Sequence, residues 1–332
     1  MTDESAASTV RQRAALVYNP VKVDLDAIKA AIATEQAQAG WAETLFYETT
    51  VEDPGAGQVR EALAAGAGVI IAAGGDGTVR VVAEAMRESD AALALLPSGT
   101  GNLLARNLDL TLSDIANSVK VAFTGVDRPI DVGLIEIEPR PGAKRSRHAY
   151  VVMAGLGIDA KMLANTNDDL KKRAGWLAYV DALSKSLRDK NQLHFRFSLD
   201  GSPQRHIRAH TIIVGNCGSL PANILLLPDA AVDDGVFDIV LLRPEGFFGW
   251  LQIIFKVVWE NGILRRSGVV GQKLMGLTKE VQALRYVKGR ELVVRLDKPQ
   301  EIELDGDSFG EASAFRTWVV PGGLRVRVPA EG

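Results

Sequence analysis

The stretch that most constrains this chain reads Val69-Ile-Ile-Ala-Ala-Gly-Gly-Asp-Gly-Thr-Val79. It opens with a short apolar run rich in β-branched residues, which is typical of a buried strand in a parallel sheet. Three glycines and one carboxylate follow, and apolar residues then recur at helical spacing as far as Met86. The sequence therefore predicts a strand, a glycine turn and a helix.

The glycine turn, Gly74 to Gly77, suits an anion. Backbone N–H groups are free at a helix N-terminus, the helix dipole favours negative charge there, and glycine lets a phosphate approach because it has no Cβ. The turn is neither a Walker loop nor a G-x-G-x-x-G motif. Asp76 would repel a phosphate unless a cation lay between them, so it suggests Mg²⁺-nucleotide binding. The alternative is a tight turn in which Asp76 caps the helix.

Composition narrows the class of protein. The chain has 332 residues, of which 47% are hydrophobic and 24% charged, so a soluble globular protein of about two domains is expected. The net charge of −3 provides no global basic field for nucleic acid.

The single cysteine, Cys217, excludes an intrachain disulfide and is expected to be a small buried residue rather than a nucleophile. No apolar run is long enough to span a bilayer, and residues 1–13 predict a disordered tail.

The first half alternates strands and helices, which favours a parallel sheet covered on both faces. Asn19, and Thr49 and Thr50, follow two of these strands and would lie at the sheet edge where open α/β sheets bind ligands. For Asn19 the alternative is a plain turn residue. The expected strands are Ala14–Tyr18, Thr44–Tyr47, the run from Val69 and Ala92–Leu96, and the expected helices include Leu25–Gln38 and Gln58–Ala65.

A second small-residue turn, Pro97 to Asn102, follows the strand Ala92–Leu96 and opens a further expected helix. Two such turns can face one cleft, which favours a phosphate site more than either turn alone. Thr100 can donate to a phosphate and Asn102 can fix a loop or a substrate hydroxyl. The alternative is that Thr100 or Asn102 only caps the helix.

Strand-like alternation dominates from Ile130 onward, so the second half is expected to be all-β, with a hairpin turn at Asp200-Gly201. A helix is expected at Trp176–Leu187, after the basic triplet Lys171–Arg173, which could approach lipid headgroups. The expected strands are Leu134–Glu138, Ala149–Met153, Leu193–Leu199, a return strand starting within Ser202–His206, Arg208–Val214, Phe237–Leu242, a hairpin of Leu292–Leu296 with Ile302–Leu304, and Trp318–Val328.

Three segments of the second half carry candidate chemistry. The polar turn Pro228–Val236 offers carboxylates and carbonyls that could hold a hard cation such as Mg²⁺, although a bare Asp-Gly turn is the alternative. The apolar stripe Phe247–Val258 is typical of a core helix, and an interfacial helix that docks on a membrane is the alternative. Asp305 follows a strand beside glycine, where it could act as a general base or form a simple β-turn.

These motifs together resemble the diacylglycerol kinase catalytic-domain family, which includes soluble bacterial diacylglycerol kinases and sphingosine and ceramide kinases. The resemblance covers nearly the whole chain from Ala14. The Gly-Gly-Asp-Gly-Thr element is shared with NAD kinases and phosphofructokinases, and its pairing with Pro97–Asn102 is more specific. The motifs are, in order, Asn19-Pro20, Gly74–Thr78, Pro97–Asn102, Asp233–Gly235 and Leu304–Gly306.

The resemblance implies a Rossmann-like first domain over residues 12–131, a β-sandwich domain over 132–317, an ATP cleft between them, and a segment 318–332 that can return to the first domain. It implies Mg²⁺ held by Asp234 with the carbonyls of Ala231 and Val236, and a proton acceptor at Asp305. The residues implied in binding ATP are Asn19, Thr49, Thr50, Gly74, Gly75, Asp76, Gly77, Thr78, Val79, Arg80, Gly99, Thr100 and Asn102.

Two positions depart from the family pattern. Many members carry Asn where Arg80 stands, and Asn-Asp-Phe where this chain has Asn102-Leu103-Leu104. The absent carboxylate at Leu103 could weaken metal or lipid coordination, or could mark a subgroup with another acceptor.

The resulting hypothesis is a cytoplasmic, ATP-dependent lipid kinase that attaches reversibly to a membrane surface and phosphorylates a lipid hydroxyl, with diacylglycerol the first candidate. Two alternatives stay open. One is an NAD kinase that uses the same glycine turn, and the other is a catalytically silent nucleotide- or lipid-binding regulator. No nucleic-acid partner is expected.

Overall fold

The computed structural model describes residues 12–99, 101–157, 192–220, 224–225, 227–243 and 284–330. The expected helices at Trp176–Leu187 and Phe247–Val258, the basic triplet Lys171–Arg173 and Thr100 lie outside these residues. The chain divides into two compact units. The first unit comprises Met1–Gly99, Leu110–Arg128 and Leu324–Gly332, and the second comprises Thr100–Asp109 and Pro129–Gly323. The domain bounds expected from the sequence stay a prediction.

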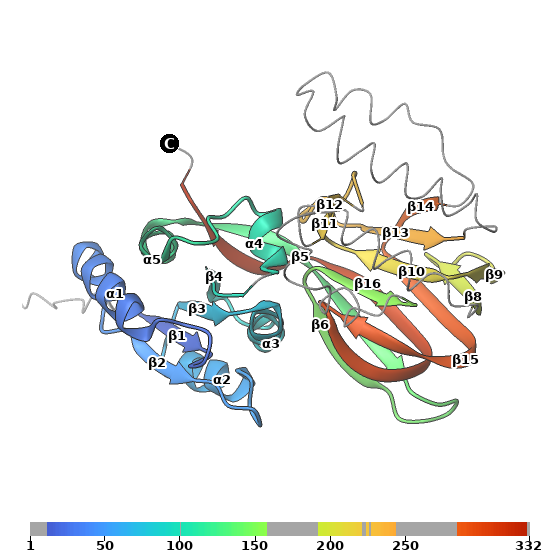
Figure 1. Ribbon diagram of the computed structural model, residues 1–332, viewed down its shortest axis with the longest axis horizontal. Coiled ribbons are helices and arrows are strands. Elements are labelled where there is room, and N and C mark those ends of the chain that lie inside the picture. Colours follow the sequence, from blue (N-terminus) through green and yellow to red (C-terminus); the bar gives the residue numbers. More distant parts are fainter. Residues whose placement is uncertain are drawn as a thin grey trace, which may run out of the picture. The chain divides into compact units, whose positions relative to one another are not determined.

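The first unit is built on a parallel sheet, as expected (Figure 1). Strand β1 pairs with β2 on one side and with β3 on the other, and β3 pairs with β4. At the other edge of β4, Arg325 and Val326 near the end of strand β16 pair in parallel with Ala92 and Leu93. The strands are β1 Ala14–Tyr18, β2 Leu45–Glu48, β3 Val69–Gly74, β4 Ala92–Pro97 and the C-terminal part of β16 Asp307–Val328.

Helices cover both faces of this sheet, and their ends follow local rules. Helix α1 begins after Asp24, whose carboxylate accepts a hydrogen bond from Ala27 N at 3.1 Å, and ends at Gly40, which has a φ of 67°. Helix α1 packs beside α5, and α2 beside α3. The helices are α1 Leu25–Ala39, α2 Ala56–Ala64, α3 Asp76–Met86 and α5 Ile115–Thr124.

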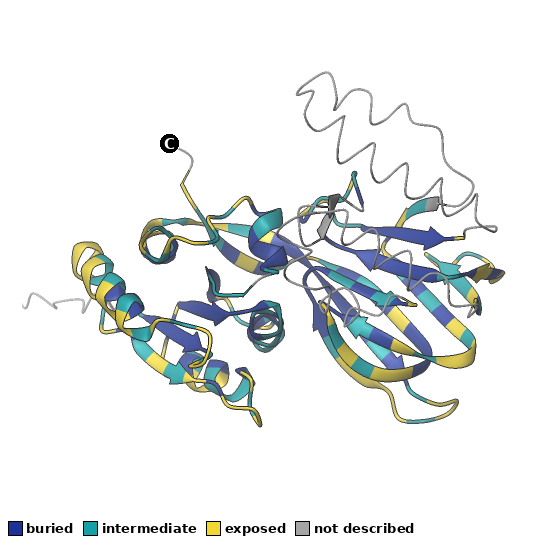
Figure 2. Ribbon diagram, in the orientation of Figure 1, coloured by how far each residue is buried: buried dark blue, intermediate teal, exposed yellow. Residues whose placement is uncertain are grey.

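Strands β1 and β3 of the first unit are buried on both sides because both faces of the sheet carry helices (Figure 2). Ala14 and Leu16 pack in one cluster with Ile28 and Ile32 of α1. The continuous apolar run in the sequence, rather than an alternation, is the signature of this two-sided burial.

The second unit consists mainly of strands, and it contains the short helix α4. Its pairs β8–β9, β13–β14 and β15–β16 are antiparallel. The elements are β5 Val126–Glu138, β6 Ser146–Tyr150, β7 Met153–Leu156, β8 Leu193–Leu199, β9 Arg205–Ala209, β10 Thr211–Gly215, β11 Ser219–Leu220, β12 Ile224–Leu225, β13 Phe237–Leu242, β14 Leu284–Gly289, β15 Glu291–Leu304, β16 Asp307–Val328 and α4 Leu103–Asn107.

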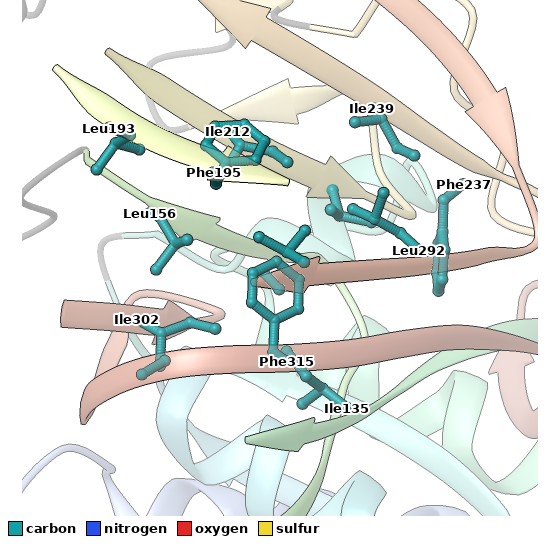
Figure 3. Close-up of a cluster of buried hydrophobic side chains, with 14 of the residues drawn as sticks. Ile135, Leu156, Leu193, Phe195, Ile212, Phe237, Ile239, Leu292, Ile302 and Phe315 are labelled. Carbon is teal, nitrogen blue, oxygen red and sulfur yellow. The ribbon is translucent and has the colours of Figure 1, made fainter. Parts of the chain in front are cut away.

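Side chains from several of these strands form one apolar core (Figure 3). Phe195, Phe237 and Phe315 lie in it and are nearly or fully buried. The ring of Tyr150 lies against Gly133, where an added Cβ would be 2.2 Å from Cζ of the tyrosine. Only glycine therefore fits at residue 133.

Three strand predictions were wrong. The expected strand Ala149–Met153 is broken into β6 and β7, and Arg208–Val214 is broken into β9 and β10 at His210. The expected hairpin over residues 292–304 is the single strand β15, whose register with β16 shifts between Arg295 and Gln300. The irregularity between Arg295 and Gln300 thus lies within one strand and is not a hairpin turn.

Two other expectations are confirmed. Asp200 and Gly201 have φ values of 49° and 71°, as a two-residue hairpin turn between right-twisted strands requires. Cys217 is free and fully buried, and burial raises the pKa of its thiol, so it is not an available nucleophile.

Candidate active site

The glycine turn leads directly into helix α3. Gly75 is the N-cap residue and Asp76 is the first helical residue, so the interpretation of Asp76 as the helix cap was wrong. The first N–H groups of any α-helix lack acceptors within the helix, and the dipole makes this end electropositive. The turn thus presents N–H groups of Gly75–Thr78 at the C-terminal end of β3.

The two glycines that open the turn serve different purposes. A Cβ at Gly74 would meet the Thr78 side chain at 2.6–2.9 Å, so Gly74 lets Thr78 fold back over the turn. A Cβ at Gly75 would lie 3.4 Å from Nζ of Lys22 and 3.9 Å from Cα of Gly99. The missing side chain at Gly75 therefore leaves a space beside an ammonium group, between two chain segments.

Asn19 shapes the turn that carries Lys22. Its N–H donates to the Ala73 carbonyl at 3.0 Å, its side-chain Oδ1 accepts from Val21 N at 3.1 Å, and its carbonyl accepts from Lys22 N at 3.1 Å. The sequence placed Asn19 correctly at the sheet edge but assigned no role to Lys22. The only sequence feature that indicated Lys22 was its position three residues after Asn19.

The threonines after β2 lie at the same edge. Thr49 is buried and its N–H donates to the Tyr18 carbonyl at 2.9 Å, whereas Thr50 is exposed. The hydroxyl of Thr50 accepts from Asp53 N at 3.0 Å. These contacts fix the backbone of both residues beside the end of β1.

A cavity of about 220 Å³ opens at this edge of the first unit. Lys22 lines it, and Ser98, which also lines it, donates its N–H to the Gly74 carbonyl at 3.1 Å. Asp24 and Asp114, the N-cap residues of α1 and α5, contribute to the wall. The cavity and the glycine turn therefore share Lys22 as a common neighbour.

Two further candidates near the turns, Arg80 and Asn102, are both buried. Arg80 is buried along α3 and its Nη1 lies 3.3 Å from Oε2 of Glu84. Asn102 is buried with a φ of 48° and occupies the N-cap position of α4, as the capping alternative expected, although its side chain makes no capping hydrogen bond.

Asp305 lies in the second unit, at the two-residue turn between β15 and β16. Its φ of 50° and that of Gly306 at 89° match a hairpin turn with both central residues at positive φ. Its carboxylate is buried and accepts three backbone N–H bonds, from Val151 to Oδ2 at 2.9 Å and from Val152 and Met153 to Oδ1 at 2.8 and 2.9 Å. These bonds occupy the backbone between β6 and β7, which explains why the expected strand is broken there.

The turn Pro228–Val236 lies beside a positively charged side chain, the ammonium group of Lys288. Nζ of Lys288 donates to the Asp229 carbonyl at 2.8 Å and lies 3.3 Å from Asp234 and 3.1 Å from Asp238. Although burial lowers the pKa of Lys288, contacts with Asp238 and Asp234 outweigh it and raise the pKa. Burial raises the pKa of Asp238. Two oxygens of the turn, the Asp229 carbonyl and Oδ2 of Asp234, therefore lie beside a positive charge.

Asp131 holds this turn in place. Its carboxylate is buried and accepts from Gly235 N at 2.6 Å and from Gly322 N at 2.9 Å, and its own N–H donates to the Val232 carbonyl at 2.7 Å. Sequence patterns did not single out Asp131, because its three partners are far away along the chain.

Two groups of predicted residues are thus assembled, each within one unit. In the first unit the structure brings together Asn19, Gly74, Gly75 and Gly99, with Lys22 added. In the second unit Asp234 lies beside Lys288 and Asp238, and Asp305 lies beside Val151–Met153.

The chain belongs to the diacylglycerol kinase catalytic-domain family. Residues 13–135 match the diacylglycerol kinase catalytic domain, and residues 151–260 match the YegS C-terminal NAD kinase beta sandwich-like domain. The architecture is accordingly a Rossmann-like catalytic domain followed by a β-sandwich-like domain.

Two relatives and one solved structure illustrate the similarity. A protein of Pseudomonas aeruginosa strain UCBPP-PA14, named "Probable lipid kinase YegS-like", is 31% identical over 96% of this chain and 95% of its own. The diacylglycerol kinase of Bacillus subtilis strain 168 is 26% identical over 90% and 91%. A crystal structure of a diacylglycerol kinase from Bacillus anthracis str. Sterne is 20% identical and superposes with a TM-score of 0.68 over 96% and 97%.

Proposed function

We propose that this protein transfers the γ-phosphate of ATP to the hydroxyl of a lipid, with diacylglycerol as the acceptor and phosphatidic acid as the product. Membership of a lipid kinase-like family supports phosphoryl transfer. The observation that carries the nucleotide half of the proposal is the space over Gly75, which adjoins both the start of α3 and the ammonium of Lys22. A phosphate is the kind of group that such a space accommodates.

The first unit would bind the triphosphate. The N–H groups of Gly74–Thr78 and the dipole of α3 would offset its charge, and Lys22 would add a full positive charge. Asn19, Thr49, Thr50, Gly99, Thr100 and Asn102 would supply the remaining contacts to ATP, with Val79 and Arg80 supporting the turn from α3.

Mg²⁺ fits two sets of residues in the proposal. Asp76 would orient the metal or its waters at the triphosphate, and Asp234 with the carbonyls of Ala231 and Val236 would hold a structural ion. One member of the second set is supported by a contact with a positive charge, because Oδ2 of Asp234 lies 3.3 Å from Nζ of Lys288. Bound Mg²⁺ supplies positive charge that stabilises the phosphoryl oxygens.

Asp305 would take the proton of the acceptor hydroxyl as that oxygen attacks phosphorus. Three backbone N–H groups fix the orientation of its carboxylate, so little reorganisation would accompany the transfer. An apolar acceptor requires contact with a membrane surface, and we expect reversible, peripheral attachment of a cytoplasmic protein. Within the described residues, no helix has the length and apolarity needed to cross a bilayer.

The test is transfer of labelled phosphate from ATP to a panel of acceptors. Diacylglycerol, monoacylglycerol, sphingosine and ceramide would be offered separately in detergent micelles, and NAD would be offered in a further reaction. Labelled phosphatidic acid is the expected product. Labelled NADP without a labelled lipid would replace the proposal by an NAD kinase, and ATP binding without any transfer would favour a silent regulator.

A further inference from the structure

A second cavity, of about 320 Å³, lies in the second unit at the edge strand β9. The described residues that line it are Phe197, Arg205, His206, Ile207, Arg208 and Arg243. Arg243 follows β13, and the hydrogen bond from His210 N to the Leu242 carbonyl, 2.8 Å long, joins the end of that strand to the start of β10. The β8–β9 hairpin and the end of β13 therefore build the cavity wall together.

The lining is strongly basic. Three arginines and a histidine contribute to it, and no carboxylate occurs among the described residues that line it. The guanidinium groups of Arg205, Arg208 and Arg243 make no ion pair with a carboxylate of any described residue. Asp297 lies at the rim, where its Oδ2 is 3.6 Å from Nε2 of His206.

Three arginines outside the cavity, by contrast, pair with carboxylates. Arg145 pairs with Glu138 at 3.0 Å, Arg316 with Glu291 at 2.7 Å and Arg327 with Asp127 at 2.7 Å. These are the usual partners of surface arginines in a chain whose net charge is −3. The three arginines of the cavity lack such carboxylate partners among the described residues.

The neighbouring strands extend the basic surface. In the pairing of β8 with β9, His194 lies opposite Arg208 and Arg196 lies opposite His206, and in the pairing with β15, Arg196 lies opposite Arg295. Directly opposed residues of antiparallel strands share one face. Arg196, Arg208 and Arg295 therefore project from the same side of the sheet, whereas Arg205, which lies opposite Phe197, projects from the other side, so the cavity is lined from both faces of the edge strand β9.

Arginines that gather without counter-charges repel one another, and a multiply charged anion relieves the repulsion. The guanidinium fork matches phosphate oxygens with paired hydrogen bonds, better than it matches a spherical ion. Phe197 and Ile207 add apolar wall, which strengthens electrostatic attraction locally and can receive a non-polar part of the ligand. The cavity volume falls within the range of small-molecule sites.

We propose that this cavity binds a phosphate group carried by an ester, either in the headgroup of an anionic phospholipid or in a free phosphate compound. The site lies wholly in the second unit and uses none of the residues assigned to ATP, Mg²⁺ or proton transfer. The proposal therefore stands whether or not the protein is a lipid kinase.

The test compares the wild-type full chain with two triple variants that lose the same three positive charges. The cavity variant is R205Q/R208Q/R243Q, and the matched control is R140Q/K144Q/R290Q, which changes exposed residues of the same unit outside the cavity. Each protein is sedimented with phosphatidylcholine vesicles that lack or contain phosphatidylglycerol, and each is titrated with inorganic phosphate.

We expect the wild type and the control to bind at least one anionic probe, and the cavity variant to bind it roughly 100-fold more weakly, at about fivefold per arginine. R243Q alone is expected to weaken binding about fivefold. Binding to anionic vesicles that inorganic phosphate displaces would identify the lipid headgroup as the ligand. Binding of inorganic phosphate without vesicle binding would identify a free phosphate compound.

The midpoint of thermal unfolding of the cavity variant should equal or exceed that of the wild type, because mutual repulsion has been removed. Three results would overturn the proposal. The cavity variant could bind both probes as the wild type does, both triple variants could lose binding equally, or the wild type could bind neither probe.

Discussion

Replacing Asp305 by asparagine tests the site most sharply, because the carboxylate accepts three backbone hydrogen bonds in addition to its proposed chemical role. An asparagine has one acceptor oxygen. If the amide oxygen takes the place of Oδ1, it keeps the bonds from Val152 and Met153, and its NH₂ group then faces the N–H of Val151. One buried donor is left without its acceptor.

The cost of leaving one buried donor unsatisfied is about 1–3 kcal/mol. For a domain of this size each kcal/mol lowers the unfolding midpoint by about 2–4 °C, so Asp305→Asn should lower it by about 2–12 °C. Loss of a general base should separately lower turnover by about 10²- to 10⁴-fold. The two effects are distinguishable because ATP binding to the folded variant should be unchanged.

The assay therefore measures thermal unfolding, ATP binding and turnover on the same preparation, well below the unfolding midpoint. Asp200→Asn is the matched control, because Asp200 also has positive φ, at 49°, in a two-residue turn. Its Oδ1 alone accepts both Arg290 N and Glu291 N at 2.8 Å, so an amide oxygen can keep both bonds. We expect Asp200→Asn to unfold within about 1 °C of the wild type.

Three results would refute this reasoning. An Asp305→Asn variant that unfolds at the wild-type temperature would show that the three bonds contribute little. Near-native lipid phosphorylation by that variant would remove Asp305 from proton transfer. A fall as large in Asp200→Asn would attribute the cost to charge loss at the turn.

Three further perturbations follow from the contacts described. Lys22→Met should weaken ATP binding about 10- to 100-fold, measured by calorimetry, because a charge-assisted contact beside Gly75 is lost. Gly133→Ala should cost about 1–3 kcal/mol or prevent folding, since its Cβ would overlap the buried ring of Tyr150. The Gly142 N–H, and then Arg145, lower the pKa of Glu138, so its stabilisation is present above about pH 4.3 and is lost as the pH falls through the folded-state value. Glu138→Gln should accordingly destabilise at neutral pH by about 1–3 kcal/mol in denaturant titrations, and the difference should shrink in acid.

Each of these changes has a control. Lys120→Met removes an exposed lysine of the first unit, and equal loss of ATP binding would contradict the role of Lys22. Gly155→Ala adds a Cβ with only ordinary contacts, 3.5 Å or longer, and should be tolerated. Glu311→Gln changes an exposed glutamate, and a matching pH dependence there would contradict the assignment to Glu138.

Local patterns were sufficient to predict several elements of the fold. The apolar runs at Ala14–Tyr18 and Phe237–Leu242 and the alternation at Leu193–Leu199 gave the observed bounds of β1, β13 and β8. The break between β6 and β7 could not be predicted, because its cause is the carboxylate of Asp305, distant along the chain. Periodicity reports local burial and not such distant partners.

The residues of the candidate site likewise fall into those that local sequence patterns indicate and those that they do not. Gly74 and Gly75 stand out in sequence because glycines between a strand and a helix have a local meaning. Lys22 and Asp131 do not stand out, because a lysine in a loop and an aspartate in a strand are ordinary until their partners are located. The basic cavity at β9 was missed for the same reason, since its arginines are dispersed along the chain.

The parallel pairing of Arg325 and Val326 with β4 has a consequence for biosynthesis. Chains are made from the N-terminus, and N-terminal domains usually fold first. Here, one edge of the parallel sheet in the first unit stays unpaired until translation has passed residue 326. During that interval the unpaired edge of β4 can mispair with strands of other nascent chains. A fragment that stops at residue 131 lacks Arg325 and Val326, so this edge of β4 would stay unpaired. We expect that fragment to aggregate under conditions in which the full chain does not.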